Sequence, residues 1–265
     1  MSRFIALVCT AVVVLGAGEA RAATDGSTPA SSSIVRVVTH VSLRTLNAVG
    51  AGPIKANQGT QSSGAFTITR LSGPASRSKL QILLSGELAW CPHCAADSWA
   101  LTIALSRFGT LRGLRQINTG TFFSTHSKAS PLYDDIQGLS FYGTRYSSKL
   151  LGFDDVTLQD RAGKPLQKLT AAQSADLARF DTASVLPALD VGGRWGFVNS
   201  GFSPLDLHGQ SAATIAAHIA HGSSVVGRDI DGLANVFTAA ICSATQGKPH
   251  VVCAASGVKA GAKVL

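Results

Sequence analysis

Two cysteines separated by two residues are the residues of this sequence best suited to do chemistry. They belong to the motif Cys91-Pro92-His93-Cys94, which follows an apolar run at Leu80–Leu84 and precedes a stretch with helical periodicity. Two thiols with this spacing on the first turn of a helix can close a disulfide with little change in the backbone, and can open it again. The motif therefore predicts a redox-active thiol pair.

The start of the expected helix gives the two thiols different roles. Free N–H groups and the helix dipole stabilise a thiolate at Cys91, which projects beyond the helix end, whereas Cys94 lies about one turn inside. His93 adds a hydrogen-bond donor and partial positive charge, and Pro92 suits a first turn, where its missing N–H costs nothing. We expect Cys91 to be the nucleophile, Cys94 to resolve the mixed disulfide and His93 to tune their reactivity.

Two regions outside the motif are candidates for holding a polypeptide substrate. Trp90 would wall one side of the site beneath a bound peptide; the alternative is an ordinary core aromatic residue. Pro187, at the start of a later predicted strand, would face the thiol pair if its peptide bond were cis, and an ordinary trans turn proline is the alternative. The predicted catalytic set is then Cys91, Cys94, His93 and Pro187, and the predicted substrate contacts are Trp90, Pro92 and Leu186.

The remaining cysteines predict a structural disulfide. Cys9 lies in the apolar N-terminal run, which leaves Cys242 and Cys253, and Gly247 and Pro249 between them allow the chain to turn back. A disulfide here would staple the last helix to the C-terminal tail; the alternative is a second redox pair. Their spacing does not fit a zinc site, and we expect no metal ion and no cofactor.

The N-terminus resembles an export signal. Arg3 precedes an apolar run at Phe4–Leu15, and Ala20-Arg21-Ala22 offers small residues at a cleavage site. We predict a signal peptide over residues 1–22 and an extracytoplasmic protein, in the periplasm, in the cell envelope or secreted. An uncleaved N-terminal membrane anchor is the alternative. An even number of cysteines in the exported chain suits an oxidising compartment.

Composition excludes several classes of protein. The chain has 265 residues, of which 45% are hydrophobic and 14% are charged, and this excludes global disorder. No segment after the signal approaches the roughly 18 consecutive apolar residues of a spanning helix, which excludes a multi-span membrane protein. The net charge of +8 comes from basic residues scattered singly, so we expect no nucleic-acid partner.

Strand and helix patterns alternate along the chain. Residues 23–33 are small and polar and predict a flexible linker, and residues 34–255 predict one α/β domain. Glycines at 192 and 193 predict a β-hairpin turn. The expected strands are Leu80–Leu84, Leu114–Thr119, Leu139–Tyr146, Gly152–Leu158, Val185–Asp190 and Trp195–Val198. One expected helix starts at the CPHC motif. Three more are expected over Thr170–Phe180, Ser211–His221 and Leu233–Thr245.

Taken together, these motifs resemble the thioredoxin-like superfamily. The Pro-His pair between the cysteines is similar to that of bacterial envelope dithiol oxidases. More narrowly, the chain is similar, from about Ile34 to Cys253, to the exported proteins of the domain-of-unknown-function 929 family. The stretches that carry the similarity are Cys91–Ala100, Ser140–Ser148, Leu186–Gly192 and the tail from Ala234 to Cys253. One departure is Ala89, which stands where that family has an acidic residue.

The resemblance implies a fold and an activity. The fold is a thioredoxin-like central mixed sheet flanked by helices, with an N-terminal extension and a helical C-terminal extension. The activity is thiol-disulfide exchange on protein thiols and disulfides, with an unidentified redox partner for which a membrane-bound protein is one candidate. The alternative is a non-catalytic envelope protein that binds or assembles others and whose cysteine pairs are both structural.

Overall fold

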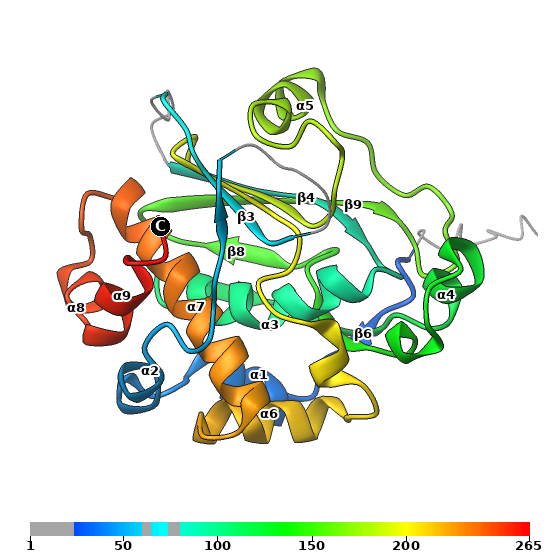
Figure 1. Ribbon diagram of the computed structural model, residues 1–265, viewed down its shortest axis with the longest axis horizontal. Helices are drawn as coiled ribbons and strands as arrows, with labels where there is room; N and C mark the ends of the chain where they lie inside the picture. The colour runs from blue at the N-terminus through cyan, green and yellow to red at the C-terminus, as the bar shows by residue number, and fades with distance from the viewer. Residues whose placement is uncertain (1–23, 60–64, 74–79) are drawn as a thin grey trace, which may run out of the picture.

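A mixed β-sheet at the centre of the molecule positions the CPHC motif (Figure 1). The computed structural model describes residues 24–59, 65–73 and 80–265, with the backbone alone at 85–87. Within this part of the chain the sheet has six strands, and in spatial order they are β2 (Asn57–Gln58), β3 (Thr67–Arg70), β11 (Trp195–Val198), β10 (Ala188–Val191), β4 (Leu80–Leu88) and β9 (Leu151–Gln159). The predicted signal peptide, residues 1–22, lies outside the described residues.

Strand directions in this sheet are mixed. β4 and β9 are parallel neighbours, and β10 is antiparallel to both β4 and β11. β10 and β11 form the predicted hairpin, in which Gly192 and Gly193 adopt φ of +65° and +66°. Asp190 Oδ1 accepts the Gly193 N–H at 2.6 Å and fixes the turn. The α/β class predicted from the sequence is therefore confirmed.

Helices cover both faces of the sheet (Figure 1). One face carries α3 (Pro92–Ser106) and α7 (Val225–Ala244), with α1 (Ser32–Thr39) and α6 (Ala212–His221) further out; α5 (Ala171–Ala178) lies on the opposite face. Almost every residue of α3 is buried because this helix is enclosed by the sheet and by α7, and Trp99 is fully buried in the core. In the described chain, no helix combines the length and the apolar character needed to cross a membrane.

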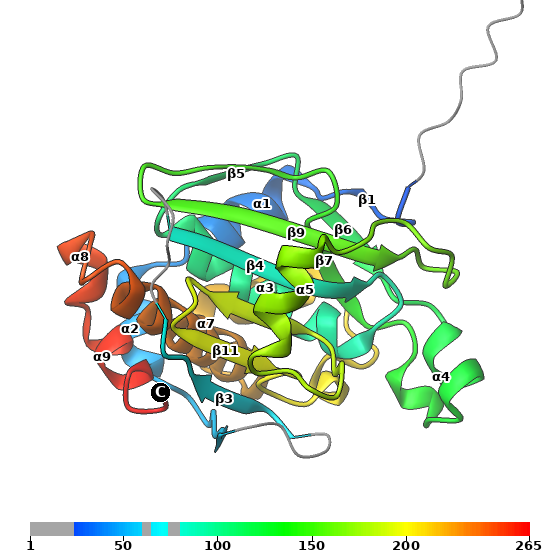
Figure 2. The same ribbon diagram turned by 90° about the horizontal axis from the view of Figure 1, so that it is seen from above.

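The segment between α3 and β9 contributes to two smaller sheets, of which the one with β6 and β7 lies beside the start of α3 and the other near its end. One joins β1 (Thr28–Pro29), β6 (Arg115–Asn118) and β7 (Gln137–Ser140), and another joins β5 (Thr110–Arg112) to β8 (Arg145–Ser147). Between β6 and β7 lie α4 (Phe122–Ser127) and the short 3₁₀ helix η1 (Pro131–Tyr133). Figure 2 shows α4 at one end of the molecule and the C-terminal helices α8 (His250–Cys253) and α9 (Ser256–Gly261) at the other.

Two predicted elements have different bounds in the structure. The strand expected over Leu139–Tyr146 is split, because β7 ends at Ser140 and the chain turns, with Gly143 at φ +75°, before β8 begins. Helix α7 begins at Val225 rather than at Leu233, and its cap Ser224 accepts the Gly227 N–H at 3.0 Å. Glycine and aspartate in the first turns of α7 hid this start from the hydrophobic pattern.

The predicted flexible linker is ordered where the structure describes it. Asp25 and Ser27 are buried, Thr28–Pro29 pairs with β6, and Ser31 caps α1 by accepting the Ile34 N–H. Small polar residues here serve as hydrogen-bonding groups and a helix cap, which the composition of the segment did not reveal. At the other end, α9 packs on α7, so the folded part also extends beyond residue 255.

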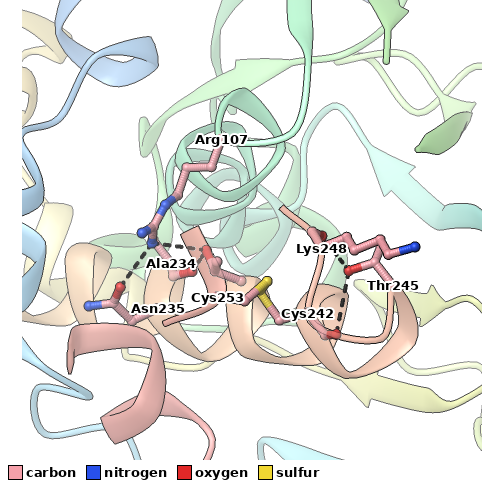
Figure 3. Close-up of a disulfide and its surroundings, with 8 residues drawn as sticks. Arg107, Ala234, Asn235, Cys242, Thr245, Lys248 and Cys253 are labelled. Atoms are coloured by element: carbon pink, nitrogen blue, oxygen red, sulfur yellow. Dashed lines mark hydrogen bonds between the residues drawn. A yellow bond between two sulfur atoms is a disulfide. The ribbon is translucent and has the colours of Figure 1, made fainter. Parts of the chain in front are cut away.

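The predicted disulfide between Cys242 and Cys253 is present (Figure 3). It joins the C-terminal part of α7 to α8 across a sequence separation of 11 residues. Thr245 Oγ1 donates to the Lys248 carbonyl at 2.6 Å within the loop that the disulfide closes. The bond therefore fixes the turn that brings the C-terminal helices back onto α7.

Replacing Cys242 and Cys253 together by alanine should lower the free energy of unfolding by about 2–3 kcal/mol, because the closed loop restricts the unfolded chain. Urea denaturation with and without a reductant measures this loss. The reductant should destabilise the wild type more than the double variant, which lacks this disulfide. Equal unfolding midpoints for the wild type and the double variant would show that the disulfide does not staple the tail.

Candidate functional site

Helix α3 begins at the CPHC motif, as the sequence predicts. Cys91 is its N-cap, with extended φ and ψ of −82° and 118°, and Pro92 occupies the first turn. The Cys94 N–H donates to Cys91 Sγ at 3.2 Å. The sulfur therefore takes the place that a serine or aspartate oxygen holds at other helix starts, and the free N–H groups of the first turn lie close to it.

The two cysteines are thiols with equal burial. Each is 5% exposed, whereas the position before the helix predicts that Cys91 projects outward. Cys91 is covered because β6 and β7 pack beside the helix start, and Ile117 and Leu139 from these strands line a cavity together with both cysteines. The position of these strands depends on long-range packing, which the local motif does not encode.

The charge of the His93 side chain differs from the prediction. Its Nδ1 lies 2.7 Å from Ser200 Oγ, and its ring is stacked on Tyr133 with centroids 5.9 Å apart. Burial lowers the pKa of His93, so the ring is neutral at pH 7 rather than partly positive. His93 can therefore act on the site through hydrogen bonding and packing, not through a cationic charge.

Trp90 packs against the aromatic side chains of α4. Its ring centroid lies 5.0 Å from that of Phe122 and 6.1 Å from that of Phe123, and its Nε1–H donates to Gln159 Oε1 at 2.8 Å. These contacts fix the half-buried indole beside the motif, between the end of β9 and α4. The structure thus places Trp90 next to the thiol pair but as a packed residue with a satisfied N–H.

Pro187 and the motif meet at one cavity. The Leu186–Pro187 peptide bond is cis, and Pro187 lines a cavity together with Cys94 and Asp97. The Leu186 side chain packs instead against an apolar cluster that contains Leu177 of α5. Leu186 could therefore meet a substrate at this cavity only through its backbone.

Asp97 is a site residue that the sequence analysis missed. It is 7% exposed, and its Oδ1 accepts the Gly201 N–H at 3.0 Å. Burial raises the pKa of Asp97 well above its usual value. The cavity that it shares with Cys94 has a volume of about 10 Å³, close to what one water molecule needs. The available signal was an acidic residue three positions after Cys94 in an otherwise apolar helix.

The fold and the site define an α/β protein with a buried Cys-Pro-His-Cys pair at a helix start. Residues 73–180 match the family described as a domain of unknown function, DUF929, and this segment contains the motif and α3. No curated protein and no solved structure matches the chain. The match supports the predicted family over the part that carries the thiol pair, whereas Pro187 and the disulfide lie outside the matched residues.

The free energy of unfolding of the wild type should fall as pH rises, and the substitution Asp97→Asn should make this fall smaller. The folded protein holds a proton on Asp97 at pH values where the unfolded chain, with a pKa near 3.9, has released it. Stability from this group is therefore lost as pH increases above about 4. Urea denaturation from pH 4 upward should show that the stability of the variant relative to the wild type rises with pH until Asp97 is also ionised in the folded protein.

The exposed Asp135→Asn is the matched control, and it should follow the wild type across the same pH range. If Asp97→Asn also parallels the wild type at every pH, Asp97 is not a buried acid in solution.

Proposed function

We propose that this protein is an exported thiol-disulfide oxidoreductase that acts on protein thiols and disulfides. The observation that carries the proposal is the hydrogen bond from the Cys94 N–H to Cys91 Sγ at the start of α3. A backbone donor in this position stabilises a thiolate on Cys91, and the thiolate is the nucleophile of thiol-disulfide exchange.

The order of elements around the motif supports a thioredoxin-like fold. Along the chain, β4, α3, β9, α5, β10, β11 and α7 occur in this order, with further elements between α3 and β9 and between β11 and α7. In space, four strands have the order β9-β4-β10-β11. Among these four, β10 is antiparallel to the other three. The cysteine pair starts the helix after a strand, and a cis proline precedes a later strand, as the family resemblance implies.

The proposed reaction has two exchange steps. In the first, the Cys91 thiolate attacks one sulfur of a substrate disulfide, the substrate S–S bond breaks, and the other substrate sulfur leaves as a thiolate that takes up a proton. In the second, the Cys94 thiolate attacks Cys91 Sγ, which closes the Cys91–Cys94 disulfide and releases the remaining substrate thiol. The substrate is reduced and the pair is oxidised; the reverse sequence oxidises a substrate dithiol.

Asp97 is the candidate base that accepts the Cys94 proton in the second step. Cys94 must lose its proton before it attacks, and Asp97 is a carboxyl group that lines the same cavity. In its ionised form, an aspartate with a raised pKa is a stronger base than an exposed one, and one water in the cavity can connect the two groups. A carboxylate on α3 thus stands in for the acidic residue that is absent at Ala89.

Location and partners follow from the same proposal. The signal peptide predicted from the sequence supports an exchange outside the cytoplasm, and a second redox protein, soluble or membrane-bound, would restore the pair after each turnover. Because Cys91 is 5% exposed, a protein disulfide reaches it only when neighbouring residues move. This burial also favours the second candidate, a non-catalytic envelope protein in which the CPHC pair is structural.

A Cys94→Ala variant should accumulate mixed disulfides through Cys91, because no thiol remains to resolve them. A Cys91→Ala variant should accumulate few or none. Incubation with a disulfide-bonded protein, followed by non-reducing electrophoresis and peptide mapping, measures both. The double variant Cys91→Ala, Cys94→Ala is the control for adducts at other positions.

Alkylation of the native reduced protein at neutral pH separates the two candidate functions. Faster labelling of Cys91 than of Cys94 is expected for the enzyme. If neither thiol reacts, or if Cys94 reacts first, the catalytic assignment is wrong and the structural role takes its place.

A further inference from the structure

A second cavity beside the thiol pair contains two hydroxyl-bearing residues. It has a volume of about 10 Å³ and is lined by Cys91, Cys94, Ser140 and Thr157, together with apolar side chains. Ser140 and Thr157 are both buried, at 3% and 1% exposed. Neither belongs to the CPHC motif or lines the cavity of Asp97, so the polar groups on this side of the thiol pair differ from those on the side of Asp97.

The hydrogen of the Ser140 hydroxyl is directed away from the cysteines. Ser140 Oγ donates to Asp25 Oδ2 and accepts the Tyr142 N–H at 3.1 Å. A serine hydroxyl has one hydrogen and two lone pairs, so after these two bonds only a lone pair remains. Ser140 can therefore accept a further hydrogen bond in the cavity but cannot donate one.

The Thr157 hydroxyl, like that of Ser140, can only accept a hydrogen bond in the cavity. Its Oγ1 donates to Asp155 Oδ2 at 3.0 Å, which occupies its single hydrogen. Both hydroxyls that line the cavity thus offer acceptors only. A water molecule that donates both hydrogens to them would again present a lone pair to the thiols, so the polarity is the same with or without that water.

The N-terminal segment keeps this arrangement in place. Asp25 is fully buried, and its Oδ1 accepts the Ser27 N–H at 3.0 Å and the Ser27 hydroxyl. Arg115 donates to Ser27 Oγ and to the Ser27 carbonyl, each at 2.6 Å, while the Arg161 N–H donates to the Asp25 carbonyl at 2.9 Å. Thr28 and Pro29 pair with β6. Each of these contacts positions the carboxylate that holds Ser140.

We propose that the N-terminal segment Thr24–Pro29 belongs to the redox site: through Asp25 it fixes Ser140 as a hydrogen-bond acceptor that, together with Thr157, favours the dithiol form of Cys91 and Cys94. A thiol can donate a weak hydrogen bond to such an acceptor, whereas a disulfide has no hydrogen to donate. Oxidation therefore removes this hydrogen bond and leaves a lone pair of each hydroxyl without a donor in a buried cavity, which is unfavourable. Asp25 and Ser140 are positioning residues that make the pair more oxidising, and this inference rests on the proposed function.

Equilibration of the mature protein with glutathione tests this proposal. One protein dithiol and one glutathione disulfide give one protein disulfide and two glutathione thiols. Acid quenching and peptide mapping report the state of Cys91 and Cys94 separately from that of Cys242 and Cys253. Ser140→Ala and Thr157→Val should each shift the equilibrium constant about three- to tenfold toward the protein disulfide, a reduction potential about 15–30 mV more negative.

Asp25→Asn should shift the constant in the same direction. Its amide N–H₂ can donate to Ser140 Oγ, which releases the serine hydrogen toward the cavity and removes the acceptor. Thr102→Val is the matched control, because Thr102 is a fully buried threonine of α3 whose Oγ1 has no hydrogen-bond partner in the described structure. Thr102→Val should leave the equilibrium constant unchanged. If a general loosening of the fold caused the shift, Thr102→Val and Thr157→Val would shift the constant alike.

The outcomes separate the two proposals. If the wild-type pair exchanges with glutathione but Asp25→Asn and Thr157→Val stay within twofold of it, the role of the N-terminal segment is wrong and the proposed function stands. If the wild-type pair does not exchange at all, both are wrong. Should Ser140→Ala fail to fold, the Asp25 and Thr157 variants still decide the question.

Discussion

The hydrogen bond between the Cys94 N–H and Cys91 Sγ is the interaction on which the proposed site depends. It makes a cysteine the cap of α3, so the first thiol of the motif and the first helical turn form one unit. The buried helix fixes this unit under the sheet, and the β10 strand brings Pro187 to it from a distant part of the chain. The sheet, the helix and the proline together hold Cys91 Sγ in a fixed, buried position.

Burial of this unit demands that every polar group around it has a partner, and these partners give the site its polarity. Asp97 receives the Gly201 N–H on one side, and Ser140 and Thr157 donate to carboxylates at the second cavity. A buried carboxyl group thus lines one cavity with Cys94, and two hydroxyl groups line a second cavity with both cysteines. Under the proposed function, both features would favour exchange between thiol and disulfide over a permanently closed bond.

The sequence predicts the local parts of this structure well because their causes are local. The CPHC helix start, the glycine hairpin and the Cys242–Cys253 disulfide follow from spacing, turn chemistry and loop length. The parts it misses depend on contacts between distant segments: the burial of Cys91 by β6 and β7, the neutral ring of His93, and the anchoring of Asp25 by Ser140 and Ser27. Asp25 shows the reason most clearly, because its Asp-Gly-Ser-Thr surroundings have the composition of a linker and acquire structure only through β6 and β7.

The reduction potential of the Cys91–Cys94 pair in the mature wild-type protein tests the central claim most directly. It can be measured by equilibration with glutathione or dithiothreitol buffers of known potential and mapping of the two thiols. A redox-active pair should have a potential well above about −300 mV, the value below which structural disulfides typically lie. A potential below that value, or thiols that never join, would contradict the account and leave the CPHC motif a structural element of the fold.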